Sequence, residues 1–170
     1  GHPEIQTPNL DRLAQSGLLL ERCYTASPIC SPARAGLLTG RNPNRSGVYT
    51  AISMMSPMHL RTREVTVSTL LKQSGYTTAL MGKWHLNGIF NLPGQPQPDD
   101  HGFEYWFALQ NIALPNHLNP YNFVRNGIPM GPMTGYAAGI VADETVAWLR
   151  KARDKARPFF LYVAFAEPHE

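Results

Sequence analysis

The chain has 170 residues, which fits one domain of ordinary size and is enough to bury a sizeable core. Hydrophobic residues make up 43% and charged residues only 16%, which excludes an intrinsically disordered chain. The 14 glycines and 15 prolines follow no repeat, so they predict turns and site-forming loops and exclude a collagen-like protein. The net charge of +3 comes mainly from a basic cluster within 150–157, so we expect no nucleic-acid partner. No stretch approaches the roughly 18 apolar residues of a membrane span.

The two ends of the chain suggest a piece of a larger protein. It begins without Met and stops just after an apolar run at 159–165. We therefore expect residues 1–170 to be part of a single domain, truncated at both ends. The N-terminus shows no targeting pattern, so the residues alone predict no localisation.

The first part of the chain predicts a helix, a strand and a second helix. Thr7 and Pro8 are typical of a helix start, and Gly17 of its end. The apolar, β-prone stretch 18–25 predicts a strand. Pro32 then stands where a helix begins and Gly40 where it ends, which places Cys30 at the N-terminus of that helix.

The middle of the chain predicts one helix and one strand between irregular segments. Residues 42–64 are polar and lack a sustained period, so we expect no regular element there. Thr66 is a typical cap for a helix whose inner face is formed by Leu70 and Leu71, and Gly75 ends it. The next stretch, 76–82, predicts a buried strand that leads into Lys83 and His85.

The rest of the chain predicts a long structured loop at 87–135, a helix from Tyr136 and a strand at 159–165 buried on both faces. The basic residues after that helix oppose its dipole, which favours a solvated helix end over a ligand site. The alternation of helices with buried strands predicts an α/β sandwich with a mainly parallel central sheet flanked by helices.

Polar residues follow the ends of three predicted strands. In α/β sheets, ligands bind at the carboxyl ends of the strands. The first strand is followed by Cys30 and Arg34, the second by Lys83 and His85, and the third by His169. These residues form a group of cations around a thiol. A helix N-terminus adds partial positive charge, so the pocket suits a tetrahedral oxyanion.

Cys30 has three interpretations on residue chemistry alone. Buried cysteines are common as small hydrophobes. A disulfide with Cys23 is a second option, although two cysteines are too few for a disulfide scaffold and lack the paired spacing of a zinc site. The third is an activated nucleophile, because a helix N-terminus and Arg34 both favour the thiolate.

The segment Cys30-Ser31-Pro32-Ala33-Arg34, followed by Leu38-Thr39-Gly40, resembles the signature of type I sulfatases. The resemblance covers essentially the whole chain and extends to four more segments: 7–13, Gly82-Lys83-Trp84-His85-Leu86, 123–135 and Pro168-His169. One residue departs from the pattern. Ala33 stands where the family usually has Ser, which we expect to lower the efficiency of maturation.

The resemblance implies an alkaline-phosphatase-like fold and a specific chemistry. Cys30 would be oxidised by a maturation enzyme to Cα-formylglycine, whose hydrated aldehyde is the nucleophile. One gem-diol oxygen would attack sulfur and displace the alcohol, and the other would expel sulfate and regenerate the aldehyde. Arg34 would hold the modified side chain. Lys83 and His85 would contact the sulfate or the hydrated aldehyde, and His169 would bind sulfate near the leaving oxygen.

The resemblance also implies a divalent cation, usually Ca²⁺, with residue 30 as one ligand. Ca²⁺ takes about six to eight oxygen ligands, and beyond Cys30 the chain offers no convincing cluster of them. Asp99 and Asp100 lie in a Pro-rich loop with no third ligand nearby, so we interpret the pair as solvated. His59, His101 and His117 receive no role. We therefore expect the 170 residues alone to show neither activity nor tight Ca²⁺ binding.

The function implied is hydrolysis of a sulfate ester of a sugar or an aryl alcohol. Two alternatives stay open: a phosphodiesterase or phosphonate monoester hydrolase of the same superfamily, and a non-catalytic relative that binds sulfated glycans. The expected partners are a sulfated substrate and the formylglycine-generating maturation enzyme. Family resemblance implies a periplasmic, secreted or lysosomal protein.

Overall fold

The computed structural model describes residues 3–169. Its helices, strands and short turns are, in chain order, α1 (Pro8–Gln15), α2 (Cys30–Thr39), α3 (Pro43–Ser46), α4 (Val67–Gln73), β1 (Thr77–Lys83), the 3-10 turn η1 (Pro98–His101), β2 (Tyr105–Leu109), β3 (Val124–Arg125), β4 (Ile128–Pro129), α5 (Ala137–Ala147), the π turn η2 (Trp148–Ala152) and β5 (Phe159–Ala164). Within these residues, no helix is long and apolar enough to cross a lipid bilayer.

A mixed five-stranded sheet of order β4-β3-β2-β1-β5 forms the centre of the fold. β1 pairs in parallel with both β2 and β5, whereas β3 pairs antiparallel with β2 and β4. Lys83 lies opposite Leu109, so β1 and β2 end together at one edge of the sheet. This confirms the predicted α/β class with parallel central strands.

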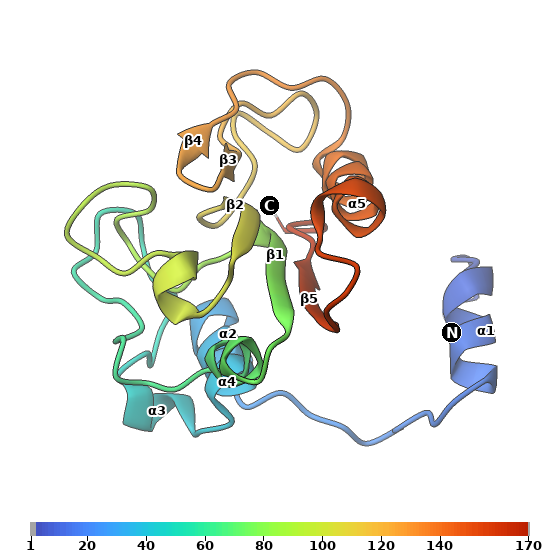
Figure 1. The fold of residues 1–170 in the computed structure, drawn as a ribbon, viewed down its shortest axis with the longest axis horizontal. Helices are drawn as coiled ribbons and strands as arrows, with labels where there is room; N and C mark the ends of the chain where they lie inside the picture. Colours follow the sequence, from blue (N-terminus) through green and yellow to red (C-terminus); the bar gives the residue numbers. More distant parts are fainter. Residues whose placement is uncertain (1–2, 170) are drawn as a thin grey trace.

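Helices α2 and α4 lie on one side of the sheet and α5 on the other (Figure 1). The side chains of β1 alternate between the cores on these two faces. Leu80 packs in the core on the α2 side, and Met81 in the core on the α5 side. Every residue of β1 is buried, as the apolar run predicts for a central strand. The end of β1 is therefore a rigid place from which to present Lys83 and His85.

One glycine allows β1 and β5 to approach closely. Gly82 has φ 99°, and a Cβ there would lie 2.1 Å from the carbonyl oxygen of Ala164. Only glycine fits both the conformation and the contact. The position of Lys83 at the end of β1 thus depends on the absence of a side chain just before it.

The predicted helices form, with one error in which side chains they bury. Gly40 ends α2 in the left-handed conformation, and the hydroxyl of Thr66 accepts from the main-chain N–H of Thr69 at the start of α4. However, Leu70 is 53% exposed, and the buried residue of α4 is Ser68. Ser68 lies inside because its hydroxyl donates to the carbonyl of His101 over 2.6 Å.

The predicted strand at 18–25 is wrong. This segment is an extended, exposed connection from α1 to α2, and α1 stands apart from the sheet (Figure 1). Leu18 is 83% exposed, and α1 has no buried residue. A strand needs a neighbouring strand for its main-chain hydrogen bonds, and no strand of the described chain lies beside this segment. Arg34 and Cys30 therefore follow a connection rather than a strand.

Three predictions need correction. The segment 42–64 is not wholly irregular, because Pro43–Ser46 forms the short helix α3, whose start is capped by the Asn42 side chain. The segment 87–135 is not only loop, because it contains η1 and the strands β2, β3 and β4. β5 forms as predicted but is not buried on both faces: Phe159 is 43% exposed and the next residues are half-buried. β5 is an edge strand of the described sheet, so only β1 covers one of its sides.

Candidate active site

Cys30 is the first residue of α2, where the chain turns from an extended Ile29 (φ −112°, ψ 143°) into the helix. No side chain of the described residues caps this N-terminus, so its first N–H groups stay available. Cys30 is half-buried and lines a pocket of about 460 Å³ together with Arg34 and Tyr162. Both cysteines are free, so the disulfide with Cys23 is not formed.

Arg34 lies one helical turn after Cys30 and is fixed by two acceptors. Its Nη1 donates to the carbonyl of Lys83 over 2.7 Å and to the hydroxyl of Tyr162 over 3.3 Å. Burial lowers the pKa of Arg34, while Tyr162 and Cys30 act to raise it. Its Nε is buried without a partner among the described residues. Arg34 therefore sets a fixed positive charge beside Cys30 and has N–H groups that these two bonds do not use.

Lys83 ends β1 and is only 2% exposed. Burial lowers the pKa of its ammonium group, Cys30 acts to raise it, and Arg34 lowers it again. Cys30 and Arg34 are therefore close enough to Lys83 for their charges to act on its ammonium group. Arg34 lines the pocket together with Cys30, whereas Lys83 is buried beside it and does not line the pocket.

His85 follows two residues later and is 1% exposed. Burial, and then the charge of Lys83, lower its pKa to about 4; the hydrogen bond to the carbonyl of Ile52 acts to raise it, and Arg34 and His169 lower it further. His85 is therefore neutral near pH 7 and adds no positive charge, unlike the cation expected from the sequence. Its φ of 55° is rare for a residue with a side chain, and such conformations concentrate at functional sites.

His169 lies after β5 and is exposed. Its main-chain N–H donates to the carbonyl of Ala166, and its own carbonyl accepts from Nε2 of His117 over 2.5 Å. Its charge acts on His85. The structure thus brings Cys30, Arg34, Lys83 and His85 into one electrostatic group, with His169 linked to it through His85.

The sequence interpretation missed residues that position this group. Tyr162 contacts Arg34 from β5, and the alternation of that strand was the signal that could have found it, since Phe160 and Tyr162 face the α2 side. Ile52 and Gln110 lie outside regular elements and hydrogen-bond to one another. No period or motif marks them, so only coordinates reveal them.

The family profile described as Sulfatase matches residues 1–170. The chain belongs to the sulfatase family. N-acetylgalactosamine-6-sulfatase of Homo sapiens is 37% identical over 195 residues, which cover 99% of this chain and 36% of that protein. The ulvan-active sulfatase of Formosa agariphila is 31% identical over 170 residues, which cover 99% of this chain and 32% of that protein. The sulfatase chain described here thus spans about a third of the length of these relatives.

Solved sulfatase structures share the fold. Ps i-CgsB in complex with k-i-k-neocarrahexaose is 30% identical with a TM-score of 0.82, covering 96% of this chain and 40% of that one. BT4656 in complex with its substrate D-glucosamine-2-N,6-O-disulfate is 32% identical with a TM-score of 0.76, covering 98% of this chain and 30% of that one. These likenesses confirm the alkaline-phosphatase-like fold expected from the signature.

Sulfatases generally use a metal ion together with formylglycine. In residues 3–169, no three or more His, Cys, Asp or Glu side chains gather where they could hold a metal ion. The donor set of the described chain therefore does not by itself fit a Ca²⁺ cage. The role of Cys30 as a metal ligand stays a prediction.

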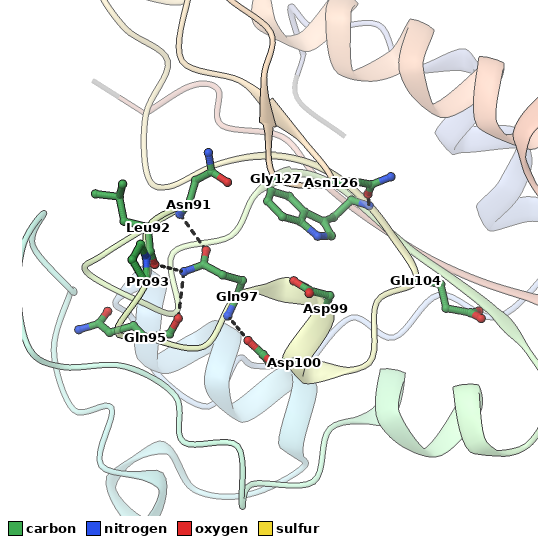
Figure 2. Close-up of a pocket in the computed structure, with 11 residues that line it drawn as sticks. Asn91, Leu92, Pro93, Gln95, Gln97, Asp99, Asp100, Glu104, Asn126 and Gly127 are labelled. Carbon is green, nitrogen blue, oxygen red and sulfur yellow. Dashed lines mark hydrogen bonds between the residues drawn. The ribbon is translucent and has the colours of Figure 1, made fainter.

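Another pocket, of about 570 Å³, lies near the start of β2, away from the strand ends that carry Lys83. Figure 2 shows that its polar groups bond to one another: the Gln97 side chain accepts from the N–H of Asn91, and Asp100 accepts from the N–H of Gln97, each over 2.8 Å. Asp99 and Asp100 are both exposed, as the interpretation of a solvated pair predicts.

Proposed function

We propose that the protein hydrolyses sulfate esters with a formylglycine formed from Cys30. The observation that carries the proposal is the place of Cys30, at the open N-terminus of α2 and in a pocket with Arg34 fixed beside it. The hydrated aldehyde at position 30 would supply the oxygen nucleophile. This site is suited to an anionic group bound next to that oxygen.

The surrounding residues have separate tasks in the proposal. Arg34 and Lys83 bind the sulfate oxygens and stabilise the charge that develops on them, because both cations are held in place before the reaction. The N–H groups at the start of α2 favour the same anion. His169, exposed at the end of the chain, binds sulfate near the leaving oxygen. His85, neutral and buried, contacts residue 30 or the sulfate.

We propose a sulfated sugar as the substrate class. The relatives that cover nearly the whole chain include an N-acetylgalactosamine-6-sulfatase and an ulvan-active sulfatase, and the similar structure of BT4656 holds a disulfated glucosamine. Steryl-sulfatase of Homo sapiens is 41% identical but over only 67% of this chain. The matches that cover nearly the whole chain therefore favour a sulfated sugar over a sulfated sterol as the substrate.

The test uses the full-length protein. Mass spectrometry of the peptide that contains residue 30 should show formylglycine, and the protein should release sulfate from an aryl sulfate faster than phosphate from an aryl phosphate. Faster hydrolysis of an aryl phosphodiester or of an aryl phosphonate monoester than of the aryl sulfate would instead indicate a phosphodiesterase or phosphonate monoester hydrolase. An unmodified thiol in the native source, with binding but no turnover of sulfated sugars, would indicate a glycan-binding relative.

Two further parts of the proposal concern the cell. Conversion of Cys30 requires a formylglycine-generating enzyme as a partner, and we propose from the family resemblance that the protein lies in the periplasm, in a lysosome or outside the cell. Both stay predictions. Co-expression with and without a formylglycine-generating enzyme checks the first, because only the co-expressed protein should carry the aldehyde.

A further inference from the structure

The main-chain carbonyl of Ile52 accepts two hydrogen bonds at the site. Nε2 of His85 lies 2.9 Å from this oxygen, and Nε2 of Gln110 donates to it over 3.2 Å. Gln110 also donates to the carbonyl of Asn87 over 2.9 Å. The amide of Gln110 therefore links the segment that contains Ile52 to the segment just after His85.

The main chain of Ile52 is also tied to α2. The main-chain N–H of Ile52 donates to the hydroxyl of Ser31 over 3.1 Å, and Ser31 is the neighbour of Cys30. Ile52, Ser31 and His85 are each 1% exposed or less. A buried chain of contacts thus runs from α2 through Ile52 to the ring of His85 and to Gln110.

These contacts determine the tautomer of His85. A carbonyl oxygen only accepts, so the proton of the neutral ring is on Nε2 and the lone pair is on Nδ1. Nδ1 is buried and has no hydrogen-bond partner among the described residues. His85 therefore offers the site an acceptor, which suits a hydroxyl group and does not suit a sulfate oxygen. Of the two contacts proposed above for His85, the tautomer thus favours the one with the hydrated aldehyde at residue 30.

We propose that Gln110 is a positioning residue for His85: by sharing the carbonyl of Ile52 it holds that oxygen where it fixes the ring with Nδ1 free to accept. The inference rests on the proposed function, because it assigns His85 a task in the reaction at residue 30. Without the Gln110 amide, the carbonyls of Ile52 and Asn87 lose a shared donor. The Ile52 oxygen, which orients the His85 ring, is then less firmly held in place.

The experiment replaces Gln110 by Met in the full-length protein, which keeps the length of the side chain and removes both donors. Gln73→Met, on the exposed end of α4, is the matched control. We expect Gln110→Met to lower kcat for an aryl sulfate by about 10- to 100-fold, the range for partners that orient a reacting group, with KM changed less than about twofold. Gln73→Met should leave both unchanged. Gln110→Glu, which keeps the shape and also removes the donors, should give the same loss if Gln110→Met folds poorly.

A double-mutant cycle separates positioning from a structural role. If Gln110 acts through His85, Gln110→Met should cause no further loss of kcat in a His85→Ala background. If the losses in kcat caused by Gln110→Met and His85→Ala multiply in the double variant, the inference is overturned. An unchanged kcat in the single variants would overturn it as well.

A measurement independent of turnover separates this inference from the proposed function. Nitrogen-15 NMR of histidine-labelled protein should show His85 protonated on Nε2, and Gln110→Met should reduce that preference. If the wild type hydrolyses no sulfate ester, the proposed function fails while the tautomer result still decides the role of Gln110. An unchanged Nε2 tautomer in Gln110→Met would count against it.

Discussion

The guanidinium of Arg34 and the carbonyl of Lys83 are joined by a hydrogen bond of 2.7 Å, which ties the helix that begins at Cys30 to the end of β1. The two residues are 49 positions apart in sequence. A side chain for which we propose anion binding is thus also part of the framework that sets the distance between the helix of Cys30 and the strand that ends at Lys83. Substitution here should affect both functions.

Cys30→Ala in the full-length protein should abolish sulfate release, because alanine provides no group to convert to formylglycine. The fold should persist, since Cys30 is only half-buried and makes no disulfide. Sulfate release and the thermal midpoint are the measurements. Cys23→Ala, at an exposed cysteine, is the control and should retain activity. Substantial turnover by Cys30→Ala would refute the formylglycine mechanism.

Arg34→Lys should lower kcat/KM by about 100-fold or more, although it keeps the charge. An ammonium group is a point charge and does not reproduce the planar guanidinium that reaches Lys83 and Tyr162 and that we propose binds the sulfate. Tyr162→Phe removes only the 3.3 Å contact, so its loss should stay within about tenfold. The measurement is steady-state kinetics of both variants with an aryl sulfate. Equal activity of Arg34→Lys and Tyr162→Phe would contradict a specific role for the planar guanidinium.

Gly82→Ala should destabilise the protein by at least about 2 kcal/mol, because the new Cβ meets the Ala164 carbonyl and the left-handed φ is unfavourable for alanine. Gly139→Ala is the matched control: Gly139 lies inside α5, and a Cβ there meets nothing within 4 Å. It should be neutral or stabilise by about 0.5–1 kcal/mol. Denaturant unfolding of both variants tests the pair, and a similar effect of the two would argue against the close approach of β1 and β5.

Glu144→Gln should make stability less sensitive to acid. Arg125 donates to Glu144 from Nε and Nη2, each over 2.6 Å, and the Tyr105 hydroxyl donates to it as well. Burial acts to raise the pKa of Glu144, but the hydrogen bonds from Arg125 and Tyr105 outweigh it and lower the pKa below its ordinary value of 4.5. A carboxylate with a lowered pKa stabilises the fold above its unfolded pKa, and this contribution disappears as the pH falls through the lowered value.

The thermal midpoint of wild type should therefore exceed that of Glu144→Gln by a constant amount above about pH 5.5, and the gap should close below pH 4.5. The loss at neutral pH should be about 1–3 kcal/mol, as for a hydrogen bond to a charged group. Glu21→Gln, at an exposed residue of the connection before α2, should leave the profile unchanged. If the difference in thermal midpoint between wild type and Glu144→Gln persists well below pH 4.5, the charge of the carboxylate does not contribute to stability.

The sequence predicted those elements that have local signals at both ends. α2 begins after Ile29 with Pro32 in its first turn and ends at Gly40, so its caps define it. β2 was missed because its five residues, Tyr105–Leu109, lie between Pro- and Gly-rich loops and its partner β1 is distant in sequence. The stretch 18–25 has strand-forming residues, but a strand exists only beside another strand, and composition does not specify that neighbour.

The same distinction between local signals and distant contacts applies to the residues of the candidate site. Cys30 and Arg34 are recognisable because they belong to one short motif, and Lys83 and His85 because they follow a buried apolar run. The neutral state of His85 was not predictable, since it results from burial and from Ile52, which lies in an irregular segment. Long-range contacts of this kind leave no periodic trace in the sequence.

The pairing of β1 with β5, which sets Thr77 opposite Phe159, also orders events during synthesis. Ribosomes add about 5–20 residues per second, so several seconds separate the emergence of the two strands. During that interval the segment with Cys30 is already outside the ribosome, while Tyr162, which completes the pocket wall, is not yet made. The maturation enzyme that we propose would therefore meet the thiol in an open chain, and the pocket would close around residue 30 only when β5 docks.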